Sequence, residues 1–178
     1  MKPSLRYSLI IAGIMIGIGL IMFITGLDMS DNAKIYQYLA LVVPIYFLYA
    51  AAKEKREHEL NGFISYGQAF KRDAAICTIS AFIQSMYQIL YFKVLNPAMV
   101  DRVKEQQLIE FEKQGMSEQQ IEISLKYTEM FVSNPALIFI STFLAILIVG
   151  LIISLIVAAI VIKDNPNPFA EAEQKVIE

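Results

Sequence analysis

The chain has 178 residues, of which 56% are hydrophobic and only 18% charged, and its formal net charge is −2. Soluble globular domains carry about 25% charged residues, so the composition favours a membrane protein over a soluble one. A net charge near zero lacks the basic surface that nucleic-acid partners require, and the single cysteine excludes an internal disulfide and a multi-cysteine metal site.

Four uncharged apolar runs predict four transmembrane helices, over residues 7–27, 35–52, 74–92 and 135–162. An α-helix rises 1.5 Å per residue, so about 20 residues cross the roughly 30 Å hydrocarbon core of a bilayer. The expected fold class is all-α, a polytopic membrane protein with a soluble helical hairpin between the third and fourth spans. We expect residues 1–163 to form a single membrane domain and residues 164–178 to form a disordered cytoplasmic tail.

Small residues in the first and fourth runs predict close helix packing. Gly13 and Gly17 form a G-x-x-x-G spacing in the first run, and small residues recur in the fourth run at Gly150, Ser154 and Ala158. Lipid supplies no hydrophobic drive between helices, so close van der Waals contact has to hold them together. The pattern is expected to mark packing within one chain or, alternatively, the face of a homo-oligomer.

The charge distribution predicts the orientation in the membrane. Asp28 and Asp31 mark the first loop as non-cytoplasmic, whereas basic residues gather between the second and third runs, at Lys53, Lys55, Arg56, Lys71 and Arg72. The positive-inside rule puts that second segment, and therefore both termini, in the cytoplasm. We expect the second helix to continue into this segment until the turn pair Asn61-Gly62.

Ser65 and Gln68 have the spacing of a capping box, which predicts that the third helix begins here. Aromatic residues and two cations follow one another on this stretch, at Phe63, Tyr66, Phe70, Lys71 and Arg72. Aromatic rings and cations favour the membrane interface. The segment is therefore expected to be an interfacial anchor or, alternatively, a contact for anionic lipid or for a partner protein.

The third run carries the polar residues Ser80, Gln84 and Gln88 at intervals of four, so they share one helix face. Amides in hydrocarbon need hydrogen-bond partners, so this face is expected to meet other helices or, alternatively, to line a polar pathway. The four runs contain no Asp, Glu, Lys, Arg or His. Because coupled transporters normally use such intramembrane charges, their absence argues against coupled transport but not against a passive pore.

Residues 97–132 predict an extracytoplasmic helical hairpin. Asn96-Pro97 is expected to cap its first helix, Gly115 to end that helix, and Ser117 with Gln120 to start the second as a capping box. Asn134 is expected to cap the fourth span. The two arms could pack together through Val100, Val103, Ile109 and Phe111 on one side and Ile121, Leu125 and Phe131 on the other.

Three stretches resemble a known family: NGFISYGQAFK at 61–71, GMSEQQI at 115–121 and GLIISLIVAAI at 150–160. Together with the order of spans and loops, they are similar to the bacterial membrane family called domain of unknown function 4199. The resemblance implies a bacterial inner-membrane protein of four helices. It brings no catalytic residues, because the family has no assigned activity.

The residues themselves also predict no enzyme, since they contain no nucleophile elbow, HExxH motif or glycine-rich phosphate loop. We therefore expect no catalytic residue, cofactor or metal. The favoured function is an accessory or scaffolding membrane protein whose hairpin binds a membrane or extracytoplasmic partner. The alternative is a small-solute channel or transporter lined by the polar face of the third span. The remaining partners are the lipid bilayer and a second copy of the chain.

Overall fold

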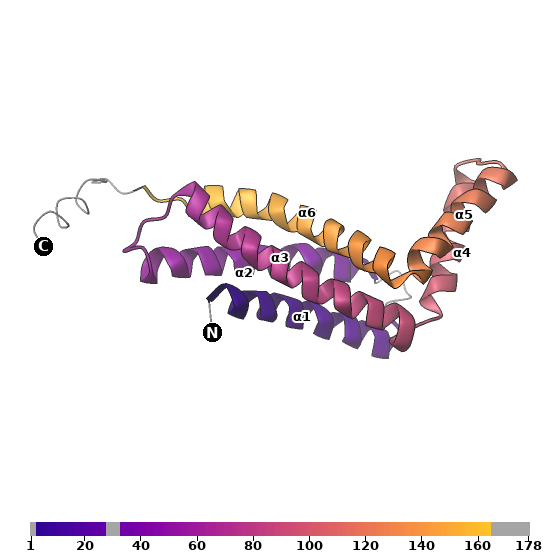
Figure 1. Cartoon of the computed structure of the whole chain (residues 1–178), viewed down its shortest axis with the longest axis horizontal. Helices are drawn as coiled ribbons and strands as arrows, with labels where there is room; N and C mark the ends of the chain where they lie inside the picture. Colours follow the sequence, from indigo (N-terminus) through magenta and orange to yellow (C-terminus); the bar gives the residue numbers. More distant parts are fainter. Residues whose placement is uncertain (1–2, 28–32, 165–178) are drawn as a thin grey trace, which may run out of the picture. The chain divides into compact units, whose positions relative to one another are not determined.

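A computed structural model describes residues 3–27 and 33–164, with the side chains of residues 33–37 outside the described set. This part of the chain is helical and contains no β-strand, so the all-α prediction is confirmed. Asp28, Asp31 and the predicted tail from residue 165 onward lie outside the described residues. In chain order (Figure 1) the helices are α1 Pro3–Thr25, α2 Ala33–His58, α3 Tyr66–Leu90, the π-helical turn η2 Tyr91–Leu95, α4 Met99–Lys113, α5 Glu118–Ser133 and α6 Pro135–Val161.

Three of the described helices are long and apolar enough to cross a membrane: Pro3–Thr25, Tyr66–Leu95 and Pro135–Val161. Within the chain only 28%, 33% and 33% of their most apolar windows are buried. Large side chains such as Ile24 and Ile160 therefore stay exposed, at 79% and 65%. Apolar surface of this extent is typical of a protein that meets lipid or another apolar surface. The second predicted span lies in α2, which is not one of these three helices.

The chain forms two compact units, one of residues 1–79 with 148–178 and the other of residues 80–147. In the first unit α1 and α2 lie side by side (Figure 1). Many of the buried residues there are alanines, which let helix backbones approach one another closely. The core of this unit includes Ile11, Ala12, Met15, Leu48, Ala51, Ala52, Ile64, Ala69, Ile76, Val157, Ala158 and Val161.

The end of α2 agrees with the predicted turn. The helix ends at His58, and Asn61 and Gly62 follow with φ of 51° and 89°. Glycine and asparagine are the residues that adopt this left-handed conformation at little cost. The chain then forms a reciprocal backbone pair, in which the Ile64 N–H donates to the Lys163 carbonyl at 3.0 Å and the Lys163 N–H to that of Ile64 at 3.1 Å. This pair ties the loop to the end of α6.

Both predicted capping boxes are confirmed. The Ser65 N–H donates to Gln68 Oε1 at 3.0 Å, the Gln68 N–H donates to Ser65 Oγ at 3.4 Å, and α3 begins at the next residue. Ser117 and Gln120 make the same pair of bonds at the start of α5. The expected cap of the fourth span is also present, since the Ala136 N–H donates to Asn134 Oδ1 at 2.9 Å.

The predicted cap of the first hairpin helix is wrong. α4 begins at Met99 after Ala98, which makes no side-chain cap bond. Asn96 instead ends η2: its backbone N–H donates to the Tyr91 carbonyl, and its side-chain amide donates to Tyr91 Oη at 3.1 Å. The π-helical turn extends α3 by five residues, to Leu95, and this extension uses the asparagine that the sequence assigned to the next helix.

The predicted helical hairpin is confirmed within the second unit, where α4 and α5 run antiparallel to one another (Figure 1). Gly115 makes the turn with φ of 71°. Two side-chain contacts set the register of the arms: Lys104 Nζ lies 3.2 Å from Glu129 Oε2, and Thr128 donates a hydrogen bond to Gln107.

Candidate functional site

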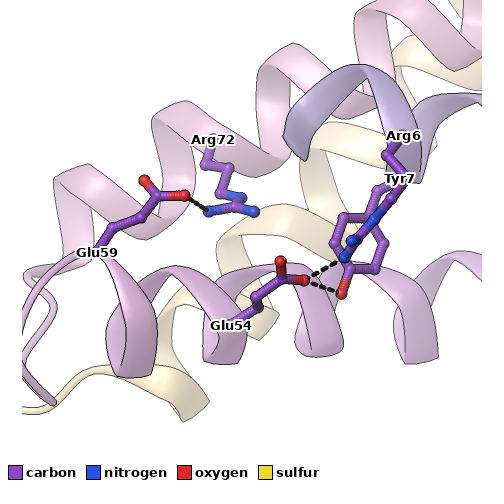
Figure 2. Close-up of polar contacts among 5 residues, drawn as sticks. All are labelled: Arg6, Tyr7, Glu54, Glu59 and Arg72. Atoms are coloured by element: carbon purple, nitrogen blue, oxygen red, sulfur yellow. Dashed lines mark hydrogen bonds and ion pairs between the residues drawn. The ribbon is translucent and has the colours of Figure 1, made fainter. Parts of the chain in front are cut away.

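Polar side chains of α1 and α2 meet at the start of α1 and the end of α2. Figure 2 shows Arg6 and Tyr7 pointing to the same carboxylate oxygen of Glu54. Arg6 Nη2 and Tyr7 Oη each donate to Glu54 Oε2 at 2.5 Å. The Arg6 guanidinium also lies 4.9 Å from the centre of the Tyr7 ring, a cation–π distance. One carboxylate therefore joins two helices through two donors.

These donors stabilise the charged form of Glu54. The hydrogen bond from Tyr7 is the largest cause that lowers the pKa of Glu54 below its usual value, and the charges of Arg6, Arg72 and His58 act in the same direction. Partial burial of the carboxyl opposes them. Glu54 consequently stays ionised, because its carboxylate form accepts both hydrogen bonds and pairs with the positive charge of Arg6.

The position of Arg72 differs from the predicted interfacial one. Arg72 is only 5% exposed. Its Nη1 lies 3.2 Å from Glu59 Oε1, and Figure 2 shows this contact. A buried guanidinium held by a carboxylate does not face lipid headgroups. The reason is the position on α3, where Arg72 turns toward the interior of the bundle while its neighbour Lys71 stays exposed.

The other predicted interfacial residues lie closer to the surface. The Tyr66 and Phe70 rings stack with centroids 6.4 Å apart and an interplanar angle of 4°. Phe63 is half-buried, and Lys163 Nζ lies 5.7 Å from the centre of its ring. Phe63, Tyr66, Phe70 and Lys71 thus remain available for an interfacial role, while Arg72 does not.

Sequence reasoning missed Asp73, the residue after Arg72. Asp73 is 0% exposed, and neither carboxylate oxygen has a hydrogen-bond partner among the described residues. It was missed because the apolar run starts at residue 74, so Asp73 was counted with the loop. The helix in fact begins at Tyr66, and the apolar helix Tyr66–Leu95 includes this ionisable residue.

Helical spacing could have found it. Asp73 precedes Cys77 by four residues and Ser80 by seven, so it extends the predicted polar face of α3 toward its N-terminus. Along that face Ser80 is buried at 3% exposure, whereas Gln84 and Gln88 are half-buried. The polar face therefore begins with a fully buried carboxyl group and continues with amides that stay partly accessible.

The small residues of the fourth run lie at a close helix crossing. A Cβ added to Gly150 would lie 2.9 Å from Cys77 Sγ and 3.0 Å from its Cβ, and Ser154 Oγ lies 3.4 Å from the same sulfur. Ala158 is fully buried. These three positions of α6 fit the packing role that the sequence indicated.

The first-run glycines do not pack closely within the chain. A Cβ added to Gly13 or Gly17 would meet no atom within 4 Å among the described residues. No close approach within the described chain supports the within-chain interpretation of this G-x-x-x-G spacing. Gly13 is exposed and Gly17 half-buried, and both interpretations of the spacing stay predictions.

Comparison with known families adds one finding. The family described as "Protein of unknown function (DUF4199)" matches residues 6–163 of the chain. The chain belongs to the DUF4199 family. No curated protein and no solved structure matches it. The expected family is thus confirmed, and because DUF4199 carries no assigned activity, the function has to be argued from the residues of this protein.

The hairpin of this DUF4199 protein is its second candidate site. Neither α4 nor α5 buries a residue completely. On α5 a row of large apolar side chains remains exposed, with exposed fractions of 56% for Ile123, 59% for Tyr127, 49% for Met130 and 46% for Phe131. Residues at these spacings share one helix face.

Proposed function

We propose that this protein crosses a bacterial inner membrane four times, with both termini in the cytoplasm. Three apolar helices support membrane insertion. The contacts of Arg6 and Tyr7 with Glu54 support an additional crossing by α2, because they join the start of α1 to the end of α2. If α1 crosses the bilayer, α2 has to cross back for these residues to meet.

Cysteine accessibility in intact cells tests this topology. In a Cys77→Ala background, single cysteines are introduced as Glu57→Cys, after the second span, and Glu122→Cys, on the hairpin. A membrane-impermeant maleimide is expected to label only the hairpin position until the membrane is permeabilised. Labelling of Glu57→Cys in intact cells would contradict four spans with cytoplasmic termini.

Within that topology the protein acts as an accessory or scaffolding protein that binds a protein partner through the α4–α5 hairpin. The observation that carries this proposal is that α5 is apolar on two faces. Thr128, which bonds to Gln107, marks the face turned toward α4, and Ile121 and Leu125 share that face by spacing. Ile123 and Tyr127 lie on the opposite, exposed face.

A second apolar face has no role in holding the hairpin together. Exposed clusters of aromatic and aliphatic residues are typical of surfaces that become buried on binding, and tyrosine, methionine and phenylalanine are enriched there. By helical spacing Glu122 and Lys126 flank this face on one side, as charged residues do at the polar rim of an interface. The protein is accordingly proposed to be a binding protein and not an enzyme.

In-cell photo-cross-linking tests the hairpin. A benzophenone amino acid replaces Tyr127 on the exposed apolar face or, as a matched control, Glu122 on the charged face. Tyr127 is expected to yield a discrete protein adduct that Glu122 does not, and Ile123→Glu should abolish that adduct. Adducts with lipid alone from Tyr127 would show that the face lies on the membrane and would contradict partner binding.

A second candidate function is a small-solute channel or transporter lined by the polar face of α3. It is favoured by one observation, the buried carboxyl of Asp73 at the start of the face that carries Ser80, Gln84 and Gln88. Intramembrane ionisable groups are typical of transport pathways. Swelling of proteoliposomes in glycerol or urea tests it: Gln84→Leu with Gln88→Leu should reduce the flux, whereas Phe82→Leu on the exposed face should not.

A further inference from the structure

Asp73 is a buried residue that has no part in the hairpin binding proposed above. Its side chain is completely buried in the unit formed by residues 1–79 and 148–178, and both carboxylate oxygens lack a hydrogen-bond partner among the described residues. A carboxylate is stable in a protein interior only when it is paired, hydrogen-bonded or neutralised. The geometry therefore requires a counterpart that neutralises this group.

The nearest cations do not supply it. Arg72 precedes Asp73 on α3, and adjacent helical side chains point about 100° apart, so they do not face each other. The one Arg72 nitrogen with a partner bonds to Glu59 at 3.2 Å. Arg72 and, to a smaller extent, Lys55 of α2 act on Asp73 through their charges, yet no ion pair joins either of them to Asp73 among the described residues.

The other helices of this unit offer no neutralising group either. On α1, Arg6 and Tyr7 are bonded to Glu54 of α2, and the buried Ser8 hydroxyl donates to the carbonyls of Ser4 and Ile76. Residues 135–161 of α6 contain no ionisable side chain. On α3 itself the thiol of Cys77 lies one turn further along, beside Ser154.

We propose that Asp73 is a proton-binding site, at which the carboxyl group carries a proton in the folded protein at neutral pH. A proton neutralises the carboxylate without any further ligand. A metal cation would need several oxygen ligands, and the charges of Arg72 and Lys55, which act on Asp73, would repel it. The site therefore suits a proton and not a metal ion.

Loss of this proton would leave a bare carboxylate in the core. The ion pairs of Arg6 with Glu54 and of Arg72 with Glu59 hold α1, α2 and α3 together around this region. Deprotonation accordingly favours an arrangement in which Asp73 reaches water or the guanidinium of Arg72. The site thus gives this end of the bundle a response to pH that does not involve the hairpin.

Infrared spectroscopy of the full chain in liposomes tests the proposal, because a protonated carboxylic acid has a carbonyl band that lies apart from the amide and carboxylate bands. At pH 7 we expect such a band, which shifts when aspartate carries ¹³C in its carboxyl group. The band should be lost completely in Asp73→Asn and retained in the control Asp101→Asn. It should also disappear reversibly as the pH is raised.

Absence of the band at pH 7, or its persistence in Asp73→Asn, would overturn the proposal. Should Asp73→Asn fail to fold, a chain in which every other aspartate is replaced by asparagine decides the matter: the isotope-sensitive band must remain. The replaced residues in that chain are Asp28, Asp31, Asp101 and Asp164. Neither measurement depends on a partner or on transport.

Discussion

Gly150 of α6 leaves no room for a side chain beside Cys77 of α3. An added Cβ would lie 2.9 Å from the Cys77 sulfur, which also lies 3.4 Å from the hydroxyl of Ser154. The two helices thus approach each other at a point where one residue has no side chain and the other has a small one. In a membrane, where lipid is as apolar as the helix surfaces, such close contact is a main source of helix association.

Gly150→Ala is therefore expected to destabilise the protein, by about 1–3 kcal/mol, because overpacking at a tight contact forces the helices apart. The measurement is the free energy of unfolding in mixed micelles as a function of the denaturing detergent. The control is Gly13→Ala, where a Cβ meets no atom within 4 Å among the described residues. There the better helix propensity of alanine should leave stability unchanged or raise it by up to about 1 kcal/mol. Equal effects at both positions would contradict the close crossing.

Tyr7 and Glu54 are expected to be energetically coupled. Tyr7 is only 8% exposed and donates to a charged carboxylate, and hydrogen bonds to charged groups contribute about 1.5–3 kcal/mol. A double-mutant cycle of Tyr7→Phe and Glu54→Gln should yield a coupling energy of about 1 kcal/mol or more. The same cycle with Arg6→Gln should yield a smaller coupling, since Arg6 is 48% exposed and water screens that pair. A coupling of zero for Tyr7 would show that the shared carboxylate does not join α1 to α2.

Acid should weaken the same contact. The pKa of Glu54 is lowered in the folded protein, chiefly by the hydrogen bond from Tyr7, so the unfolded chain binds a proton more readily than the folded one. The stabilisation is complete above the ordinary glutamate pKa of about 4.3 and is lost as the pH falls through the lower folded value. The thermal midpoints of wild type and Glu54→Gln should therefore differ at pH 7 and converge as the pH falls through the lowered pKa of Glu54. A difference that stays constant with pH would contradict the charged state of Glu54.

The sequence predicted most of the helices because their signals are local. The capping boxes at Ser65 and Ser117 and the turn at Asn61-Gly62 depend only on residues within one helical turn, and the structure contains each of them. The start of α4 was mispredicted because η2 continues α3 as far as Leu95 and takes Asn96 as its last bonding residue. Whether η2 continues α3 depends on the packing of the buried Tyr91 ring, which no short sequence motif predicts.

The candidate site was harder to predict for a related reason. Charged residues beside an apolar run are typical of loops, so the sequence predicts Arg72 at the lipid interface and gives Asp73 no role. Both residues are buried because α3 starts well before its apolar run and its second turn already faces the interior, whereas Tyr66, Gly67 and Gln68 of its first turn stay exposed. The glycine spacing of α1 shows the converse: Gly13 and Gly17 match a packing motif, yet an added Cβ at either position would meet no atom within 4 Å among the described residues.

Replacing Arg72 should lower the stability of the protein more than replacing Lys71. Arg72 is buried, so Arg72→Ala loses the packing of a long side chain as well as its bond to Glu59, at a cost of about 2 kcal/mol or more. Lys71 is exposed, and Lys71→Ala should change stability by less than about 0.5 kcal/mol. Native mass spectrometry should show the opposite order for retained anionic lipid, with a loss for Lys71→Ala only. Loss of lipid on removal of Arg72 without a change in stability would restore the interfacial interpretation.

The hairpin can be weakened without touching the spans. Ser117 Oγ accepts a hydrogen bond from the Gln120 N–H, and the Ser117 N–H donates the reciprocal bond to Gln120 Oε1. Ser117→Ala removes the first of these bonds and should cost about 1 kcal/mol at the start of α5. α4 and α5 contain no fully buried residue, so little packing is available to compensate for that loss. Hydrogen exchange should therefore accelerate across residues 118–133 while the buried part of α1 exchanges as before. If the hairpin binds a partner in the cell, photo-cross-linking from Tyr127 should fall in parallel with this loss of order. A frayed α5 with unchanged cross-linking would instead show that the exposed apolar face is recognised without its helical conformation.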